Sequence, residues 1–405
     1  MQAIAQLSGD VKQYLIITGN YWAFTLTDGA LRMLVILHFH QLGYSPLEIA
    51  LLFVFYEVFG IITNLIGGWL GAIIGLNNTM QIGLVLQIIA LSMLLVPAEM
   101  LSIIWVMIAQ ALSGIAKDLN KMSAKSAIKL LIPETAQNKL YKWVALLTGS
   151  KNTLKGAGFF LGGALLSTLG FHDAILAMVV GLAIVCVLAF IFLKKDLGRA
   201  SIKPKFKQLF SNQSNINCLS AARLFLFAAR DVWFVVALPV YLNTTFGWDY
   251  WSVGAFLAGW VVIYGGIQSI APKITGPTPD GRHVFKYTCL LSIIPMVIAL
   301  ALQFSFQADI ALLLGLGLFG VVFAINSSIH SYLIVSYAKK DGVSMDVGFY
   351  YMANATGRLL GTLFSGWVFQ SYGFEACLWI SSLLILLSSV ISYALPHRVS
   401  TSTHC

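Results

Sequence analysis

Long apolar stretches follow one another along almost the entire chain, and this pattern constrains the fold more than any single motif. The hydrocarbon core of a bilayer is about 30 Å thick and needs about 20 apolar residues for each helix that crosses it. Cutting the chain where Gly, Pro, Asn and charged residues interrupt the apolar stretches predicts twelve segments. They are 13–38, 47–74, 79–97, 101–130, 140–169, 174–193, 216–242, 250–274, 284–304, 309–337, 345–371 and 374–395.

Composition excludes a water-soluble fold, because 58% of the residues are hydrophobic and only 10% are charged. A short polar tip leads directly into an apolar segment at Tyr14, so the first segment is predicted to be a membrane span and not a cleaved signal peptide. We therefore predict an all-α polytopic membrane protein.

The sequence contains no motif for metal binding, a disulfide frame, ATP hydrolysis or nucleophilic catalysis. The cysteines form neither a C-x-x-C motif nor a Cys/His cluster, so we expect no cofactor, metal or disulfide frame. A phosphate-binding G-x-x-x-x-G-K-[ST] loop is absent, which argues against direct ATP hydrolysis, and no nucleophile adjoins a base, which argues against an enzyme. The cysteines are Cys186, Cys218, Cys289, Cys377 and Cys405.

Basic residues are distributed unevenly over the predicted topology. None of the 25 Lys and Arg residues falls in a loop that would be external. The positive-inside rule therefore predicts that both termini and the link between the sixth and seventh spans are cytoplasmic. The link could instead bind anionic lipid or nucleic acid, but the sequence shows no nucleic-acid module. Its basic residues are Lys194, Lys195, Arg199, Lys203, Lys205 and Lys207.

The two halves of the chain resemble each other at a shift of 203 positions. We predict an N-terminal six-helix half at 1–193, a basic cytoplasmic linker at 194–215 and a C-terminal six-helix half at 216–405. Secondary transporters are often built from such repeats, with substrate bound where the halves meet. The matched residues are Lys155, Gly158, Gly163, Gly170 and Phe171 with Arg358, Gly361, Gly366, Gly373 and Phe374, and Phe24 and Asp28 with Phe227 and Asp231.

This architecture resembles the major facilitator superfamily. The loop signature that this family carries after its second helix survives only in part, at 67–75, where the usual acidic and basic residues are missing. The resemblance therefore leaves open whether a gating salt bridge forms at this loop.

Charged side chains inside the predicted spans indicate the kind of substrate. Each Lys or Arg at a helix centre costs about 2.5–3.5 kcal/mol to insert, so we expect these side chains to face a watery cavity. Basic residues outnumber the acidic ones, and an anionic substrate would balance the excess. The basic residues are Arg32, Lys117, Lys121, Lys151, Lys155, Arg223, Arg230 and Arg358, and the acidic ones are Asp28, Glu57, Asp118 and Asp231.

Lys155 and Arg358 are the favoured substrate contacts, because each lies near the middle of its span and each is the repeat mate of the other. Arginine binds phosphate or carboxylate through a fork of donors, and lysine adds a compact charge. The further predicted contacts are Arg32, Arg230, Lys151, Lys121, Asn354 and Asn326. For the two asparagines, bonding between helices is the more common alternative.

The remaining ionisable groups have competing interpretations. Asp28 lies four residues before Arg32 and Asp231 follows Arg230, so for both acids an ion pair is favoured over gating or substrate contact. Glu57 and His330 could carry a proton across, although a hydrogen-bonded interior position is favoured for both. We expect Lys125 and Lys129 to reach out of the membrane at the cytoplasmic end.

Three polar segments, 14–43, 109–129 and 219–241, resemble the ArsJ-type organoarsenical efflux permeases of this superfamily. The resemblance extends over nearly the whole chain. It implies bacterial export of 1-arseno-3-phosphoglycerate, which glyceraldehyde-3-phosphate dehydrogenase forms when it uses arsenate in place of phosphate. Arsenate resistance would follow, with the dehydrogenase as the functional partner that supplies the substrate.

The residues agree with an anionic ester, and the scattered cysteines argue against trivalent arsenic, which prefers thiolates. An organophosphate/phosphate exchanger of the same fold is the nearest alternative. A drug pump, a membrane enzyme and a sensor fit less well. We expect a monomer surrounded by lipid.

Overall fold

A computed structural model describes residues 9–43, 52–133, 136–193, 197–200, 213–304 and 307–397. These residues form helices and contain no strand, so the predicted all-α fold is confirmed. In chain order the α-helices are α2 (Gly9–Gln41), α4 (Val54–Ile74), α5 (Leu76–Ser92), α6 (Ile103–Leu131), α7 (Gln137–Phe192), α8 (Ser214–Phe234), α9 (Ala237–Thr244), α10 (Tyr250–Thr275), α11 (Gly281–Gln303), α12 (Ala308–Tyr337) and α13 (Val343–Ser392).

The longest helices, α7 and α13, each contain two membrane crossings. The backbone turns at Gly170 in α7 (φ 77°) and at Gly373 in α13 (φ 85°). A positive φ of this kind favours glycine, which has no Cβ to clash with the backbone. The two glycines are repeat mates, so the same break divides both halves.

The helices account for the predicted number of crossings. Within the described residues, eight helical stretches are long and apolar enough to cross a membrane, and α7 and α13 are among them. The helices α2 and α6, of 33 and 29 residues, have sufficient length but contain the interior charges described below. With α7 and α13 counted as two crossings each, twelve crossings result.

The seventh crossing is interrupted between α8 and α9. Pro239 has no N–H to donate to the carbonyl of Val235 and its ring clashes with that carbonyl, so the helix breaks at this point. The backbone N–H groups of Val236 and Ala237 lie 3.4 and 3.1 Å from Ser365 Oγ of α13, which accepts from both. Two backbone N–H groups at this break are thereby satisfied within the membrane.

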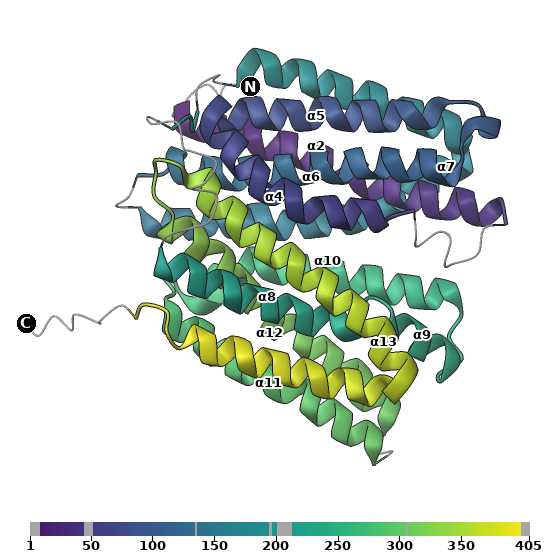
Figure 1. Ribbon diagram of the computed structural model, residues 1–405, viewed down its shortest axis with the longest axis vertical. Coiled ribbons are helices and arrows are strands. Elements are labelled where there is room, and N and C mark those ends of the chain that lie inside the picture. The colour runs from purple at the N-terminus through teal and green to yellow at the C-terminus, as the bar shows by residue number, and fades with distance from the viewer. Residues whose placement is uncertain are drawn as a thin grey trace, which may run out of the picture.

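Two helical bundles lie side by side, one containing α2 and α4–α7 and the other containing α8–α13 (Figure 1). Glycines allow close packing at matched positions in each bundle. A Cβ built at Gly158 of α7 would lie 2.7 Å from the carbonyl oxygen of Leu26 in α2. A Cβ built at its mate Gly361 of α13 would lie 2.6 Å from the carbonyl oxygen of Ala228 in α8. Each half therefore brings its fifth crossing to backbone contact with its first.

Hydrogen bonds that join the bundles gather toward the end where α2 begins and α13 ends, at the left in Figure 1. Ser344 Oγ donates to the carbonyl oxygen of Gly68 (2.7 Å), and Lys129 Nζ donates to that of Ser336 (2.8 Å). Tyr141 and Thr275 hydroxyls lie 3.0 Å apart. Gly68 belongs to the 67–75 segment, where the family signature lacks its charges, and the structure places residues 67–74 of that segment in α4 and not in a loop.

Basic residues lie at this same end: Lys139 in the first turn of α7, Lys273 in the last turn of α10 and Lys339 just after α12. In the predicted linker, residues 194–196 and 201–212 lie outside the described part of the chain. Within the described part, Ala200 N donates to the carbonyl oxygen of Ala72 (2.8 Å), so the start of the linker packs against the end of α4.

Adding a methyl group at the matched glycines tests the repeat. We expect Gly158→Ala and Gly361→Ala each to lower the thermal unfolding temperature of the purified protein, because the new Cβ would meet a backbone carbonyl. The controls are Gly163→Ala and Gly366→Ala on the same two helices, where a built Cβ meets nothing closer than 4.0 Å. Equal unfolding temperatures for all four variants would contradict this packing.

Candidate functional site

A chain of charged side chains crosses from one bundle to the other. Glu57 Oε1 of α4 lies 3.5 Å from an Arg32 nitrogen of α2 and 3.2 Å from an Arg358 nitrogen of α13. Arg358 Nε also donates to Oδ2 of Asp231 (3.3 Å). The other oxygen of this carboxylate, Asp231 Oδ1, lies 2.5 Å from a guanidinium nitrogen of Arg230. The chain runs from fully buried Asp231 to Glu57 and Arg358, which are about one third exposed. Water can reach its centre, so an exchange of ions there is physically possible.

Asp28 of α2 does not form the ion pair with Arg32 that the sequence predicts. Tyr56 OH donates to Asp28, at 2.8 Å from Oδ1 and 3.1 Å from Oδ2, while Arg32 pairs with Glu57. The Arg32 guanidinium lies 4.9 and 4.8 Å from the ring centroids of Phe53 and Tyr56, so cation–π attraction draws it toward α4. The predicted Asp28–Arg32 pair is therefore wrong, whereas the predicted Arg230–Asp231 pair is confirmed.

A second acid, Asp118 of α6, lies beside two lysines of the same helix. Asp118 Oδ1 lies 2.5 Å from Lys121 Nζ and Asp118 Oδ2 lies 3.9 Å from Lys117 Nζ. Lys117 also lies over the ring of Tyr56 (3.7 Å) and Lys121 over that of Tyr351 (4.7 Å). Lys121 is thus an ion-paired residue that lies between the two bundles.

Lys151 and Lys155 differ from these cations, because neither has an ion pair or hydrogen bond with any described residue. Both side chains are partly exposed on α7. A Cβ built at Gly29 would lie 2.7 Å from the carbonyl oxygen of Lys155, which places Lys155 against the turn of α2 that carries Asp28 and Arg32.

The repeat mates Lys155 and Arg358 therefore have unequal partners. Arg358 contacts two carboxylates, Glu57 and Asp231. Asp28, the mate of Asp231, instead accepts from Tyr56, and no carboxylate of the described residues forms an ion pair with Lys155. This asymmetry provides a cation that an incoming anion can bind without first breaking an ion pair.

The neutral candidates and His330 lie away from the ion-pair chain. Asn354 Oδ1 accepts from Arg223 Nε (2.9 Å), and Asn326 Nδ2 donates to Thr288 Oγ1 (2.8 Å), a bond between α12 and α11. His330 is fully buried, and neither ring nitrogen has a partner within the described structure. For Asn326 the structure thus favours the alternative of helix-to-helix bonding.

Lys125 and Lys129 were expected to reach out of the membrane, and that prediction is wrong. They are only 3% and 8% exposed. Lys125 Nζ donates to Tyr351 OH, and Lys129 Nζ donates to the carbonyl oxygen of Ser336 in the opposite bundle. Their four-residue spacing indicated one helix face, but only the packing of the bundles shows that this face is covered.

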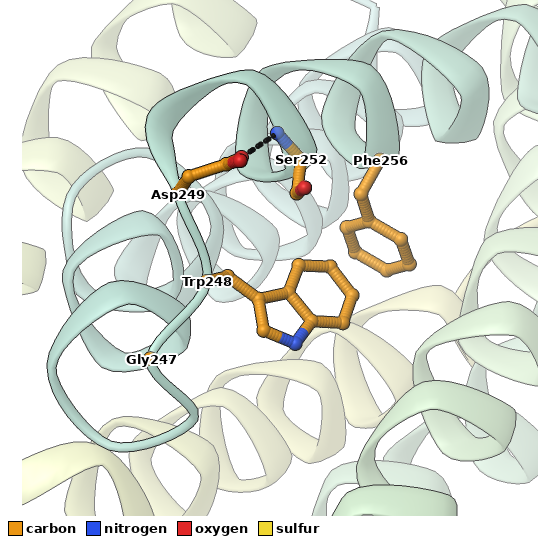
Figure 2. A pocket seen from close by; sticks show the side chains of 5 residues that line it. All are labelled: Gly247, Trp248, Asp249, Ser252 and Phe256. Atoms are coloured by element: carbon orange, nitrogen blue, oxygen red, sulfur yellow. Dashed lines mark hydrogen bonds between the residues drawn. The ribbon is translucent and has the colours of Figure 1, made fainter.

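A shallow surface depression lies at the start of α10, away from these charges. It is lined by Gly247, Trp248, Asp249, Ser252 and Phe256 (Figure 2). Asp249 Oδ1 accepts from the Ser252 N–H (2.6 Å) and caps the helix, and the rings of Trp248 and Phe256 pack edge to face. No basic side chain lines the depression, so it does not suit an anion.

Known proteins share this fold. The human organic anion transporter MFSD10 (TETRAN) is 16% identical, with a TM-score of 0.77 over 95% of this chain and 100% of that one. The proton:xylose symporter XylE bound to 6-bromo-6-deoxy-D-glucose is 13% identical, with a TM-score of 0.74 over 95% of each chain. The transporter FucP in the outward conformation is 11% identical, with a TM-score of 0.73 over 95% of this chain and 99% of that one.

No curated protein matches the sequence closely enough to indicate a substrate. The profile of the Major Facilitator Superfamily matches residues 15–331, which is most of the chain. The fold, with its two six-crossing halves, agrees with this match. The chain therefore belongs to the Major Facilitator Superfamily, a family of multi-pass membrane proteins that act as secondary transporters.

Proposed function

We propose that this protein exports a small organic anion, and specifically the organoarsenical 1-arseno-3-phosphoglycerate. The observation that carries the proposal is the pair of half-buried lysines, Lys151 and Lys155, which have no acid partner within the described residues. Lys155 lies against the turn of α2 that carries Arg32, beside the Arg32–Glu57–Arg358 chain, and Lys151 lies one turn earlier on the same helix. A lysine in a low-dielectric interior attracts an anion strongly, and nearby arginines offer paired donors for phosphate or arsenate oxygens.

The substrate would compete with Glu57 for its two arginines. Glu57 joins the bundles through Arg358 and also holds Arg32. An oxyanion bound to Lys155 could take over one or both arginines, which would release the carboxylate that ties α4 to α13. Substrate binding would thereby change the interaction between the halves, as alternating access requires.

The proposed direction of access follows from the basic residues at one end of the helices. If the positive-inside rule holds, the end that carries Lys139, Lys273 and Lys339 is cytoplasmic, with both termini there. The hydrogen bonds between the bundles gather at that end, so with this orientation the conformation would be closed toward the cytoplasm. Export would begin when those bonds break and the anion enters from the cytoplasm.

Two further considerations support the class of substrate. MFSD10, which has the same fold, is described as an organic anion transporter. Arsenic itself is suggested by the resemblance of three segments to ArsJ-type permeases, with glyceraldehyde-3-phosphate dehydrogenase forming the substrate in a bacterial cell. The protein would act as a monomer in the inner membrane and need no cofactor.

An organophosphate/phosphate exchanger is the second candidate, because Lys151, Lys155 and the arginines offer phosphate the same donors that they offer arsenate. The two functions differ in the requirement for a counter-anion. Export would proceed without external phosphate, whereas exchange would stop.

Neutralising Lys155 tests the site. We expect Lys155→Gln to reduce export at least about tenfold at unchanged membrane abundance, since a hydrogen bond to a charged group contributes about 1.5–3 kcal/mol. Uptake into inverted vesicles measures this effect. Lys139→Gln, an exposed lysine on the same helix, is the control. Full transport by Lys155→Gln would exclude Lys155 as a substrate contact.

Neutralising Arg358 should also reduce export at unchanged abundance. Arg358→Gln is a less specific test, because it also removes a cation from Asp231 and Glu57. In the double variant Arg358→Gln/Glu57→Gln, no carboxylate at position 57 is left without its arginine. We expect it to stay impaired, as substrate would still lack Arg358. Restored export would instead assign Arg358 a purely structural role.

The substrate is tested in arsenate-loaded cells with and without this protein, each with and without the arsenylating dehydrogenase. We expect lower arsenic retention only when both proteins are present, since the ester forms only with the enzyme. Unchanged retention with the protein confirmed in the membrane would contradict arsenical export. Uptake of external phosphate esters by vesicles loaded with phosphate, and no uptake by vesicles without phosphate, would then support the organophosphate/phosphate exchanger.

A further inference from the structure

Two buried cations lie on opposite bundles, closer to the basic end than the Glu57–Arg358 pair. Lys125 of α6 and Arg223 of α8 are each only 3% exposed. Lys125 donates to Tyr351 OH, and Arg223 donates to Asn354 Oδ1 (2.9 Å) and to Ser327 Oγ (3.0 Å). Tyr351 and Asn354 lie one turn apart on α13, so both cations bind the same short stretch of that helix.

Neither cation has a carboxylate partner among the described residues. Asp118 is bound by Lys117 and Lys121, and Asp231 and Glu57 by arginines of the chain described above. Neutral hydrogen-bond acceptors offset only part of the free energy that burying a charge costs. The two sites thus retain unbalanced positive charge inside the protein.

Unpartnered polar groups lie near Arg223, on α12 and α13. The guanidinium lies 5.4 Å from the ring centroid of Tyr350, whose buried hydroxyl has no hydrogen-bond partner. On α12, His330 lies one turn beyond Ser327, and both of its ring nitrogens are likewise buried without a partner. The hydroxyl of Ser331 is in the same condition. Each of these groups can donate a hydrogen bond to an anion.

We propose that Lys125 and Arg223, with Tyr350 and His330, form an inner anion site that binds a second oxyanion group of the substrate. The inference rests on the proposed function, in which the first group binds at Lys155 and Arg358. It specifies a substrate with an anionic group at each end. The proposed organoarsenical, which carries arsenate at one end and phosphate at the other, has this form.

The spacing of the two sites sets the length of the substrate. Arg358 and Asn354 are four residues apart on α13, and Arg230 and Arg223 are seven residues apart on α8. At 1.5 Å per residue the inner site lies about 6–10 Å from the outer one along these helices. A short carbon chain with two terminal oxyanions spans this distance, whereas inorganic phosphate does not.

Opening of the basic end would expose the inner site to the cytoplasm. Lys125 lies on one bundle, and Tyr351 and Arg223 lie on the other, so separating the bundles at this end breaks the Lys125–Tyr351 contact. An anion held between Lys125 and Arg223 would draw the two bundles together again. Binding at the inner site would therefore favour closure behind the substrate.

Two phosphate esters that differ at one end test the proposal. Glycerol 3-phosphate carries one anionic group, and 3-phosphoglycerate carries a carboxylate at the other end as well. Isothermal titration of the purified protein should show at least about tenfold tighter binding of 3-phosphoglycerate. We expect Arg223→Gln and Lys125→Gln each to bring the two affinities together, while Lys139→Gln keeps the preference.

The outcomes separate the inner site from the proposed function. Equal affinity of the unmodified protein for the two esters would overturn the inner site alone, and so would a preference that survives in both variants. Binding of neither ester would overturn the proposed anion transport and the inner site together. If Arg223→Gln does not fold, Lys125→Gln and the preference of the unmodified protein still decide the question.

Discussion

The Glu57 carboxylate holds the charged interior together, because it contacts an arginine from each bundle. In a membrane protein the interior offers little water to solvate charge, so each buried cation needs an acid, a polar cage or a ligand. Glu57, Asp118 and Asp231 meet this need for the cations near them. Among the cations without an ion pair, Lys151 and Lys155 also lack a hydrogen bond with any described residue, and for this reason we propose that the substrate binds there.

Close backbone packing places these charges. Gly158 and Gly361 bring the fifth and eleventh crossings against the first and seventh, which sets Lys155 beside the turn of Asp28 and Arg358 beside Asp231. The scaffold is therefore nearly the same in both halves. The charges are not symmetric, because Asp231 pairs with Arg358 whereas its mate Asp28 accepts from Tyr56 and forms no ion pair with Lys155. A symmetric fold thus supports an asymmetric site, in which one mate is paired and the other is open to a ligand.

Much of the fold could be predicted from local pattern. The twelve apolar segments, the all-α class and the matched breaks at Gly170 and Gly373 all follow from residue type and spacing. Within the site, the Arg230–Asp231 pair was predictable because the residues adjoin. Pairing of Asp28 with Arg32 was not a safe prediction, since a four-residue spacing permits contact but cannot exclude a stronger partner on another helix.

The sequence by itself determined that this chain crosses a membrane about twelve times in two related halves and that its interior holds more positive than negative charge. These properties depend on composition and periodicity, which local residues decide. Only the tertiary structure decided which cations remain unpaired, and why Lys125 and Lys129 are buried. The physical reason is that ion pairing and burial depend on distances between helices that are far apart in the chain, and no periodicity within one helix specifies those distances.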